Sequence, residues 1–158
     1  DMSTSGLMII PLTKAALRDL SIQFQNRTIK KTYHAILHGK LDKDSGCINI
    51  PIITDWPNRP LQKICYESGK EAITYYKVCG YDDLTGNTTV IFKPITGRSH
   101  QLRLHSLAIG HPILGCQLYH ANGSEKSSER LMLHASSLSF KHPKSEDIIS
   151  LTSTPPFP

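Results

Sequence analysis

Several patterns that would assign this chain of 158 residues to a class of protein are missing from it. Pro11 interrupts the longest apolar run, Gly6–Leu12, which falls far short of the roughly 18 residues of a membrane span. No basic start followed by an apolar stretch suggests a secretory signal, and no repeat is present. With 39% hydrophobic and 20% charged residues, the composition is too apolar for a disordered chain. These observations predict one globular domain over residues 1–158, with no membrane partner.

Motifs for metals, nucleotides and nucleophilic triads are also missing. The four cysteines lie far apart without a Cys-x-x-Cys pair, which favours free thiols in a reducing compartment and predicts a cytoplasmic protein. His34 and His38 would lie about 13 Å apart on a strand, too far to share a metal ion. The sequence contains no Walker loop, no Gly-x-Gly-x-x-Gly and no Gly-x-Ser-x-Gly elbow. We therefore expect no metal and no cofactor.

Helical and strand-like patterns are interleaved along the chain. Thr13 can cap a helix that runs to about Gln25, and a second helical pattern covers Ser99–Ile109. Strand patterns occupy Leu7–Pro11, Thr32–His38, Cys47–Ile53, Ile73–Tyr81, Thr88–Ile95 and Leu131–Phe140. Their hairpin spacing predicts an α+β domain with a largely antiparallel sheet. The Pro-rich end, residues 152–158, is expected to fray.

The densest group of polar and basic residues runs from Gly97 to His105. A glycine between a strand and a helix leaves backbone N–H groups and the positive end of the helix dipole facing one point, which suits a phosphate. Arg103, further along the helix, could face a different direction. An ordinary strand–helix connection with a solvated basic face explains the spacing equally well. Further donors at this point would come from the side chains of Arg98, Ser99, His100 and Gln101.

An aromatic residue beside basic residues offers a second candidate site. Tyr33 follows Lys30 and Lys31, so its ring could stack on a nucleobase, worth roughly 1–3 kcal/mol, while the lysines hold phosphates. The formal net charge of +5 permits a polyanionic partner without establishing one. A core tyrosine whose hydroxyl finds one partner is the commoner case. Spacing alone does not rank the carboxylates of Asp1, Asp19 and Asp55.

A set of short blocks follows in order across nearly the whole chain: Asp1–Leu7, Lys31–Ala35, Gly97–His105, His111–Gly115 and Leu133–Ala135. The first block is similar to the latter part of a His-Arg-Leu-Asp-x-x-Thr-Ser-Gly motif. The second resembles Lys-x-Tyr-x-Ala, and the third resembles Gly-Arg-x-His-Gln-Leu-Arg-x-His. Together the blocks resemble the RluA family of pseudouridine synthases. The loop Asp55–Pro60 with Gln62-Lys63 is similar to the subgroup that acts on both tRNA and 23S rRNA.

The resemblance implies a pseudouridine synthase fold, with a long, mainly antiparallel mixed sheet flanked by helices and crossed by an RNA cleft. It implies the isomerisation of uridine to pseudouridine in 23S rRNA, the tRNA anticodon stem-loop, or both. Asp1 matches the catalytic aspartate, Tyr33 the tyrosine that stacks on the uracil and is a candidate for removing the C5 proton, and Arg103 the arginine paired with the aspartate. The expected RNA-binding residues are Lys31, Arg59, Lys63, Arg98, His100 and Gln101.

The sequence departs from the family's pattern at two positions. The His-Arg-Leu before the aspartate is missing, so we expect a catalytic domain truncated at its N-terminus. Cys116 stands where the family usually has an aspartate after Gly115. A catalytically silent RNA-binding or chaperone module is the alternative to an enzyme. We expect a monomer, and the sequence does not identify the modified uridine.

Overall fold

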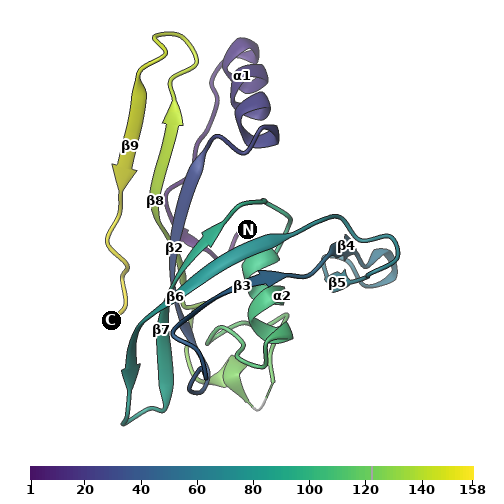
Figure 1. Ribbon diagram of the computed structural model, residues 1–158, viewed down its shortest axis with the longest axis vertical. Coiled ribbons are helices and arrows are strands. Elements are labelled where there is room, and N and C mark those ends of the chain that lie inside the picture. Colours follow the sequence, from purple (N-terminus) through teal and green to yellow (C-terminus); the bar gives the residue numbers. More distant parts are fainter. Residues whose placement is uncertain (122) are drawn as a thin grey trace.

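The computed structural model describes residues 1–121 and 123–158. In this part of the chain, six strands of a seven-stranded sheet have the order β1-β8-β2-β7-β6-β3 (Figure 1). The seventh strand, β9, also pairs with β8, further along that strand than β1 does. The pairing of β1 with β8 is parallel and the other pairings are antiparallel. These strands are β1 (Ser5–Gly6), β2 (Lys30–Leu37), β3 (Ser45–Asn49), β6 (Ile73–Asp82), β7 (Asn87–Pro94), β8 (Leu133–Lys141) and β9 (Ile148–Thr152). The predicted α+β fold with a mainly antiparallel mixed sheet is confirmed.

Two helices and a small hairpin complete the fold. The helices are α1 (Lys14–Gln25) and α2 (Gln101–Ala108). The antiparallel hairpin of β4 (Ile52–Thr54) and β5 (Gln62–Ile64) stands apart from the large sheet in Figure 1. Short 3-10 helices occupy Trp56–Asn58, between β4 and β5, and Ser124–Lys126. No helix of the described residues is long and apolar enough to cross a membrane.

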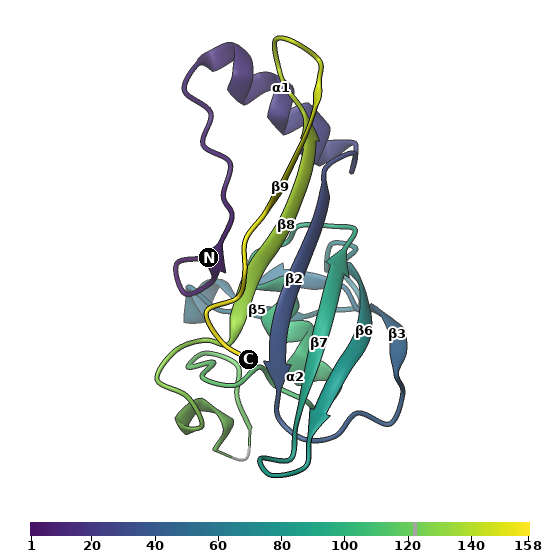
Figure 2. The same cartoon turned by 90° about the vertical axis from the view of Figure 1, so that its left-hand side faces the viewer.

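The main hydrophobic core lies between the large sheet and α2. Alternate residues of β2 and β7 are buried, among them Leu37 and Phe92, because successive strand side chains point to opposite faces. Leu102 and Leu104 of α2 belong to the same cluster. Figure 2 shows α2 behind the strands, on this face of the sheet. Hydrogen bonds from Gln101 to Ile73 and Thr74 fix the start of α2 against β6.

Helix α1 begins as the sequence predicts. Thr13 is its N-cap, and the backbone N of Ala16 donates to the Thr13 hydroxyl over 3.1 Å. Leu17, Leu20 and Phe24 have the spacing of an apolar stripe on this helix, but only Leu20 is buried, while Leu17 and Phe24 are about half exposed. Figure 2 shows why: α1 lies near the far end of β8 and β2, away from α2 and the core.

Three local predictions differ from the structure. The strand expected at Leu7–Pro11 is instead the two-residue β1 at Ser5–Gly6, and Met8 and Ile10 beyond it are exposed. The strand expected at Cys47–Ile53 is divided between β3 and β4. Strand β9 was not expected. The bounds of β1 and β3 are set by pairing with β8 and β6, which are distant in sequence, and local hydrophobicity does not show them. Strand β9 forms a hairpin with the adjacent β8.

The C-terminal segment also differs from the expected frayed end. Thr152 is the last residue of β9, and the backbone N of Ser153 donates to the Ser136 carbonyl over 2.9 Å. The ring of Phe157 lies edge-on to His134, with 6.4 Å between centroids, and the Arg130 guanidinium lies 5.7 Å from it. These contacts hold the segment against β8.

Candidate active site

A cleft of about 430 Å³ lies where the N-terminal segment, β2, β8 and the start of α2 meet. This volume is in the range of small-molecule sites in proteins. The cleft contains all three residues that the sequence suggested for catalysis, Asp1, Tyr33 and Arg103. The expected RNA-binding residues that line it are Lys31, Arg98, His100 and Gln101. Arg103 therefore faces the same cleft as Arg98.

The pairing of β1 with β8 places Asp1 in this cleft. The backbone N of Leu7 donates to the Ala135 carbonyl over 3.0 Å. Gly6 has φ +98°, and a Cβ at this position would lie 2.3 Å from the Ala135 oxygen. Only glycine allows so close an approach of the two backbones with this dihedral angle. The Thr-Ser-Gly part of the motif is thus the segment that docks the aspartate on the sheet.

The Asp1 carboxylate is held by a buried arginine and by its own turn. Arg103 Nη1 lies 3.0 Å from Asp1 Oδ1 and 3.2 Å from Oδ2. The Thr4 hydroxyl donates to Oδ2 over 3.0 Å and the Ser3 backbone N to Oδ1 over 3.2 Å. The side chain of Arg103 is only 3% exposed and that of Asp1 is 18% exposed. A buried guanidinium requires a counter-charge, and this carboxylate supplies it.

Two further groups orient Arg103. Its Nε donates to the Sγ of Cys116 over 3.3 Å, and its guanidinium carbon lies 5.5 Å from the centroid of the Tyr119 ring. Cys116 and Tyr119 are both buried. Neither contact is predicted by the sequence. Cys116 stands out only as a departure from the family pattern, and no motif includes Tyr119.

Tyr33 enters the cleft from β2, beside a β-bulge. Thr32 pairs with Ser137 and Tyr33 with Ala135, so Ser136 is the extra residue on β8. Bulges re-aim neighbouring side chains, and they occur often beside active sites. Burial raises the pKa of the Tyr33 hydroxyl. At neutral pH the side chain is therefore a neutral phenol, with an aromatic face and a hydrogen-bond donor.

Three of the basic residues border the cleft, Lys31 from β2 and both Arg98 and His100 from the segment between β7 and α2. Lys31 Nζ donates to the Thr96 carbonyl over 3.2 Å, and burial lowers the pKa of this lysine. Arg98 Nε donates to the Glu71 carbonyl over 2.9 Å. His100 has a left-handed backbone, φ +53°, and its Nδ1 lies 2.9 Å from the Tyr119 hydroxyl. These contacts fix the three side chains around the cleft.

The structure gives Gln101 a different role from the expected one. Its Oε1 accepts from the Thr96 hydroxyl over 2.7 Å and from the Arg98 backbone N over 3.0 Å. Its Nε2 donates to the Ile73 carbonyl over 3.1 Å and to the Thr74 hydroxyl over 2.9 Å. An amide side chain has two donor and two acceptor positions, and all four are occupied by this chain. The buried Gln101 therefore ties α2 to β6, and its side chain has no position left for a phosphate.

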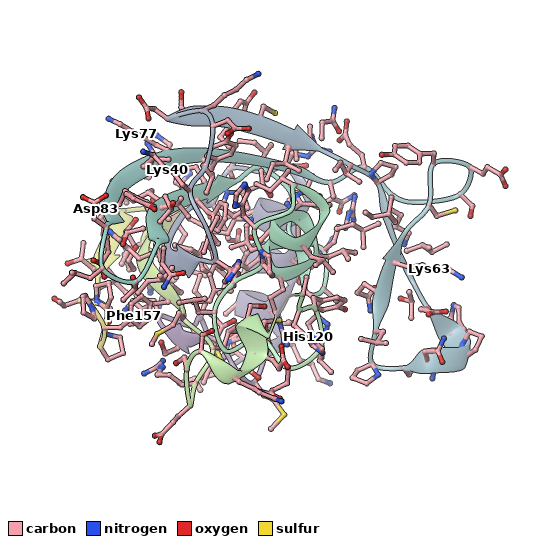
Figure 3. All side chains as sticks on the ribbon, turned by 90° about the horizontal axis from the view of Figure 1, so that it is seen from below. Lys40, Lys63, Lys77, Asp83, His120 and Phe157 are labelled. Atoms are coloured by element: carbon pink, nitrogen blue, oxygen red, sulfur yellow. The ribbon has the colours of Figure 1, made fainter. Side chains whose placement is uncertain are left out.

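Arg59 and Lys63 lie outside the cleft, on the β4–β5 hairpin. Figure 3 shows Lys63 on this hairpin, set apart from α2. Its Nζ is 3.5 Å from Asp55 Oδ1. The Arg59 guanidinium stacks 3.4 Å from the ring centroid of Trp56, whose side chain is exposed. The structure thus separates these two residues from the other expected RNA-binding side chains.

No group of three or more His, Cys, Asp or Glu side chains among the described residues could hold a metal ion. The charged groups of the cleft are the Asp1 carboxylate and the cations of Lys31, Arg98 and Arg103. A site with one carboxylate held by an arginine, a neutral phenol and two further cations suits proton transfer or nucleophilic attack on an anionic substrate.

Comparisons with known proteins agree with this geometry. A model of the family described as RNA pseudouridylate synthase matches residues 1–108. Proteins named dual-specificity RNA pseudouridine synthase RluA are 51% identical in Pasteurella multocida, over 99% of this chain and 71% of that protein, and 54% identical in Yersinia pestis, over 91% and 69%. The Escherichia coli K12 protein of the same name is 51% identical, and the match covers 90% of this chain and 65% of that protein. The structure of human RNA Pseudouridylate Synthase Domain Containing 1 superposes with a TM-score of 0.83 at 31% identity, covering 99% of this chain and 67% of that one.

Proposed function

Because this chain belongs to the RNA pseudouridylate synthase family, we propose that it is an enzyme that converts uridine in RNA to pseudouridine. In this isomerisation the glycosidic bond between N1 and the ribose C1′ breaks, the uracil turns, and C5 bonds to C1′. C5 then loses its proton and N1 gains one, so the product is an isomer of the substrate. The observation that carries the proposal is the pairing of Asp1 with Arg103 in a cleft that also contains Tyr33.

Asp1 is the group that starts the reaction, as nucleophile or base. A carboxylate must be ionised for either role, and burial disfavours the ionised form. The Arg103 guanidinium offsets this effect by a charge-assisted hydrogen bond, and the Thr4 hydroxyl and Ser3 backbone N fix the direction of the carboxylate. Arg103 itself is held by Cys116 and Tyr119, so it need not reorganise when substrate enters.

Tyr33 provides the surface on which the uracil stacks. Its ring lines the cleft from the bulge in the β2–β8 pairing, across from the Asp1 segment. Because burial raises the pKa of the hydroxyl, the phenol keeps its proton at neutral pH. Tyr33 can remove the C5 proton only if its own proton is first passed to another acceptor. Stacking is therefore the role that its protonation state favours.

The RNA is held by basic side chains that line the cleft. The target uridine must leave its base stack, because the enzyme cannot reach the glycosidic bond inside a helix. Lys31, Arg98 and His100 then contact the phosphates next to it, while Arg59 and Lys63 on the hairpin contact more distant nucleotides. We assign 23S rRNA and the tRNA anticodon stem-loop as substrates, since the relatives at 51–54% identity are named as dual-specificity enzymes. The free thiols of Cys47, Cys65, Cys79 and Cys116 support a reducing, cytoplasmic location.

The test is to incubate the protein with 23S rRNA and tRNA transcripts and to map pseudouridine by carbodiimide-stop primer extension. We expect new stops with the unaltered protein and none with Asp1→Asn, which keeps the size of the side chain and loses its charge. Absence of stops with the unaltered protein, or the same stops with Asp1→Asn, contradicts the assignment. RNA binding that survives Asp1→Ala with no product from either protein would identify a silent RNA-binding module instead.

A further inference from the structure

Tyr119 connects three parts of the molecule that lie far apart in sequence. Its hydroxyl accepts a hydrogen bond from the backbone N of Gln62, the first residue of β5, over 2.8 Å. The same oxygen lies 2.9 Å from Nδ1 of His100, and the two rings meet edge-on with 5.5 Å between centroids. The ring also lies against the Arg103 guanidinium. Only 4% of Tyr119 is exposed, so the hydroxyl cannot rely on bulk water for its partners.

The partners of the Tyr119 hydroxyl indicate which way its hydrogen bond with His100 runs. A backbone N–H is an obligatory donor, so Gln62 occupies an acceptor position of the Tyr119 oxygen. Among residues 1–121 and 123–158, His100 Nδ1 is the acceptor that remains for the tyrosine's own O–H. With Tyr119 as the donor, the bond runs from its hydroxyl to His100 Nδ1, which then carries no proton. A neutral imidazole with a bare Nδ1 has its proton on Nε2.

We propose that Tyr119 is a positioning residue that holds His100 as the neutral imidazole protonated on Nε2, so that the cleft presents an N–H donor to a phosphate oxygen of the RNA. The inference rests on the proposed function, because it assigns the donor to the same RNA cleft. The Nδ1 edge of the ring faces Tyr119, and His100 lines the cleft. The Nε2 edge is thus the part of the ring that is left for the substrate.

The surroundings of His100 favour this form. Burial, followed by the positive charge of Arg103, lowers the pKa of His100. A charged imidazole would carry a proton on both nitrogens and would lose the hydrogen bond from Tyr119. The contacts of the His100 ring with Tyr119 are formed in the protein without RNA, so the tautomer is set before RNA arrives.

The first test is spectroscopic and needs no activity. A long-range ¹H–¹⁵N spectrum of the protein labelled with ¹⁵N-histidine distinguishes bare from protonated ring nitrogens, and His100→Ala assigns the signals. We expect a bare Nδ1 and a protonated Nε2 at neutral pH in the unaltered protein. In Tyr119→Phe we expect a mixture of tautomers. A protonated Nδ1 in the unaltered protein, or an unchanged spectrum in Tyr119→Phe, would overturn the inference.

The second test separates RNA affinity from chemistry. Tyr119→Phe keeps the ring against Arg103 and removes only the hydroxyl, so KM for a uridine-tritiated 23S rRNA transcript should rise about three- to tenfold with a smaller change in kcat. Tyr75→Phe, which removes a hydroxyl from an exposed tyrosine on β6, is the matched control. A rise in KM equal to that of the control contradicts the proposal.

A double variant shows whether Tyr119 acts through His100 or through the hairpin. If it acts through His100, His100→Ala combined with Tyr119→Phe should raise KM no more than His100→Ala alone. If the two effects multiply, Tyr119 acts through its bond to Gln62, and the inference fails. Tritium release by the unaltered protein reports on the proposed function separately. Failure of the inference is therefore distinguishable from failure of the function.

Discussion

Replacing Gly6 by alanine tests how the catalytic carboxylate is placed. A Cβ on Gly6 would lie 2.3 Å from the carbonyl oxygen of Ala135 and 2.8 Å from its backbone N. Real Cβ atoms essentially never come closer than 3.0 Å to another heavy atom, so β1 must move outward by roughly 0.7 Å or more. The positive φ of +98° adds strain of about 1–3 kcal/mol. The backbone of β8 cannot yield, because it pairs with β2 along its other edge.

The effect on folding is limited by how little holds β1. Two residues pair with β8, and the backbone N of Leu7 and the hydroxyl of Ser5 add hydrogen bonds worth about 1 kcal/mol each. The segment is also held by the ion pair of Asp1 with the buried Arg103, whose loss costs about 3 kcal/mol or more. The segment can therefore detach at a cost of about 5 kcal/mol and leave the core between α2 and the sheet intact. Asp1 detaches with the segment, and its carboxylate no longer has the hydrogen-bond geometry to Arg103. A misplacement of about 1 Å lowers catalysis by about 100-fold.

We therefore expect Gly6→Ala to lower kcat/KM about 100-fold in the tritium-release assay while the free energy of unfolding falls by no more than about 5 kcal/mol in urea. Gly80→Ala on β6 is the matched control, since no described atom lies within 4 Å of the added Cβ and its φ is not positive. The control should change both quantities little. Full activity of Gly6→Ala, with Gly80→Ala behaving as expected, would refute the argument that β1 must touch β8 to place Asp1.

The remaining predictions concern stability, pH and salt. Gln101→Leu leaves four partners without their bonds and should lower the free energy of unfolding by about 3 kcal/mol or more in urea; weakened RNA binding with unchanged stability would restore the phosphate role. Cys116→Ala removes the acceptor of the Arg103 Nε and should lower the free energy of unfolding by about 1–3 kcal/mol. Cys116→Ser keeps an acceptor and should lower it less; equal losses in the two variants would contradict a hydrogen bond between Cys116 and Arg103. Burial lowers the pKa of His105, so the unfolded chain binds a proton at this residue at a higher pH than the folded chain does. The contribution of His105 to the free energy of unfolding is therefore fully present above about pH 6.5 and falls below it by about 1.4 kcal/mol per pH unit. In urea unfolding at several pH values, His105→Gln should remove this part of the pH dependence. Arg98→Ala should reduce the slope of log affinity for RNA against log salt by about 0.7, and an unchanged slope would mean that Arg98 contacts no phosphate.

The sequence was most informative where a local pattern coincides with a local structure. Helix α1 begins at its predicted cap, Thr13, and the hairpin of β6 and β7 lies within a residue or so of its expected bounds. Short-range signals suffice there, because the cap bonds to Ala16 and the two strands are joined by a tight turn. The end of the chain shows the limit: prolines predict fraying, but Phe157 packs on His134, which composition does not reveal.

The candidate site could be predicted only in part. Spacing did not rank Asp1 above other aspartates, because its partner Arg103 is 102 residues away and only the fold brings the two together. The family resemblance supplied that pair. It did not distinguish Gln101, whose motif position suggests substrate contact but whose side-chain amide bonds only to β6 and to the loop before α2. A motif shows which residues a family keeps, and the hydrogen-bond partners decide whether a residue holds the substrate or the fold.

The arrangement of the molecule separates chemistry from the choice of RNA. Asp1, Tyr33 and Arg103 reach the cleft from β1, β2 and α2, which pack on one sheet and one core, so their mutual geometry depends on the body of the fold. Arg59 and Lys63 lie on the exposed part of the β4–β5 hairpin (Figure 3), whose residues Ile52 and Ile64 belong to or pack against the core. A change at the exposed side chains can therefore alter which RNA is bound without moving the reacting groups. Tyr119 links the hairpin to the cleft, since its hydroxyl forms hydrogen bonds with Gln62 on the hairpin and with His100 at the cleft. Substitutions at Tyr119 should accordingly affect RNA affinity and the cleft together, whereas substitutions at Lys63 should affect RNA affinity alone.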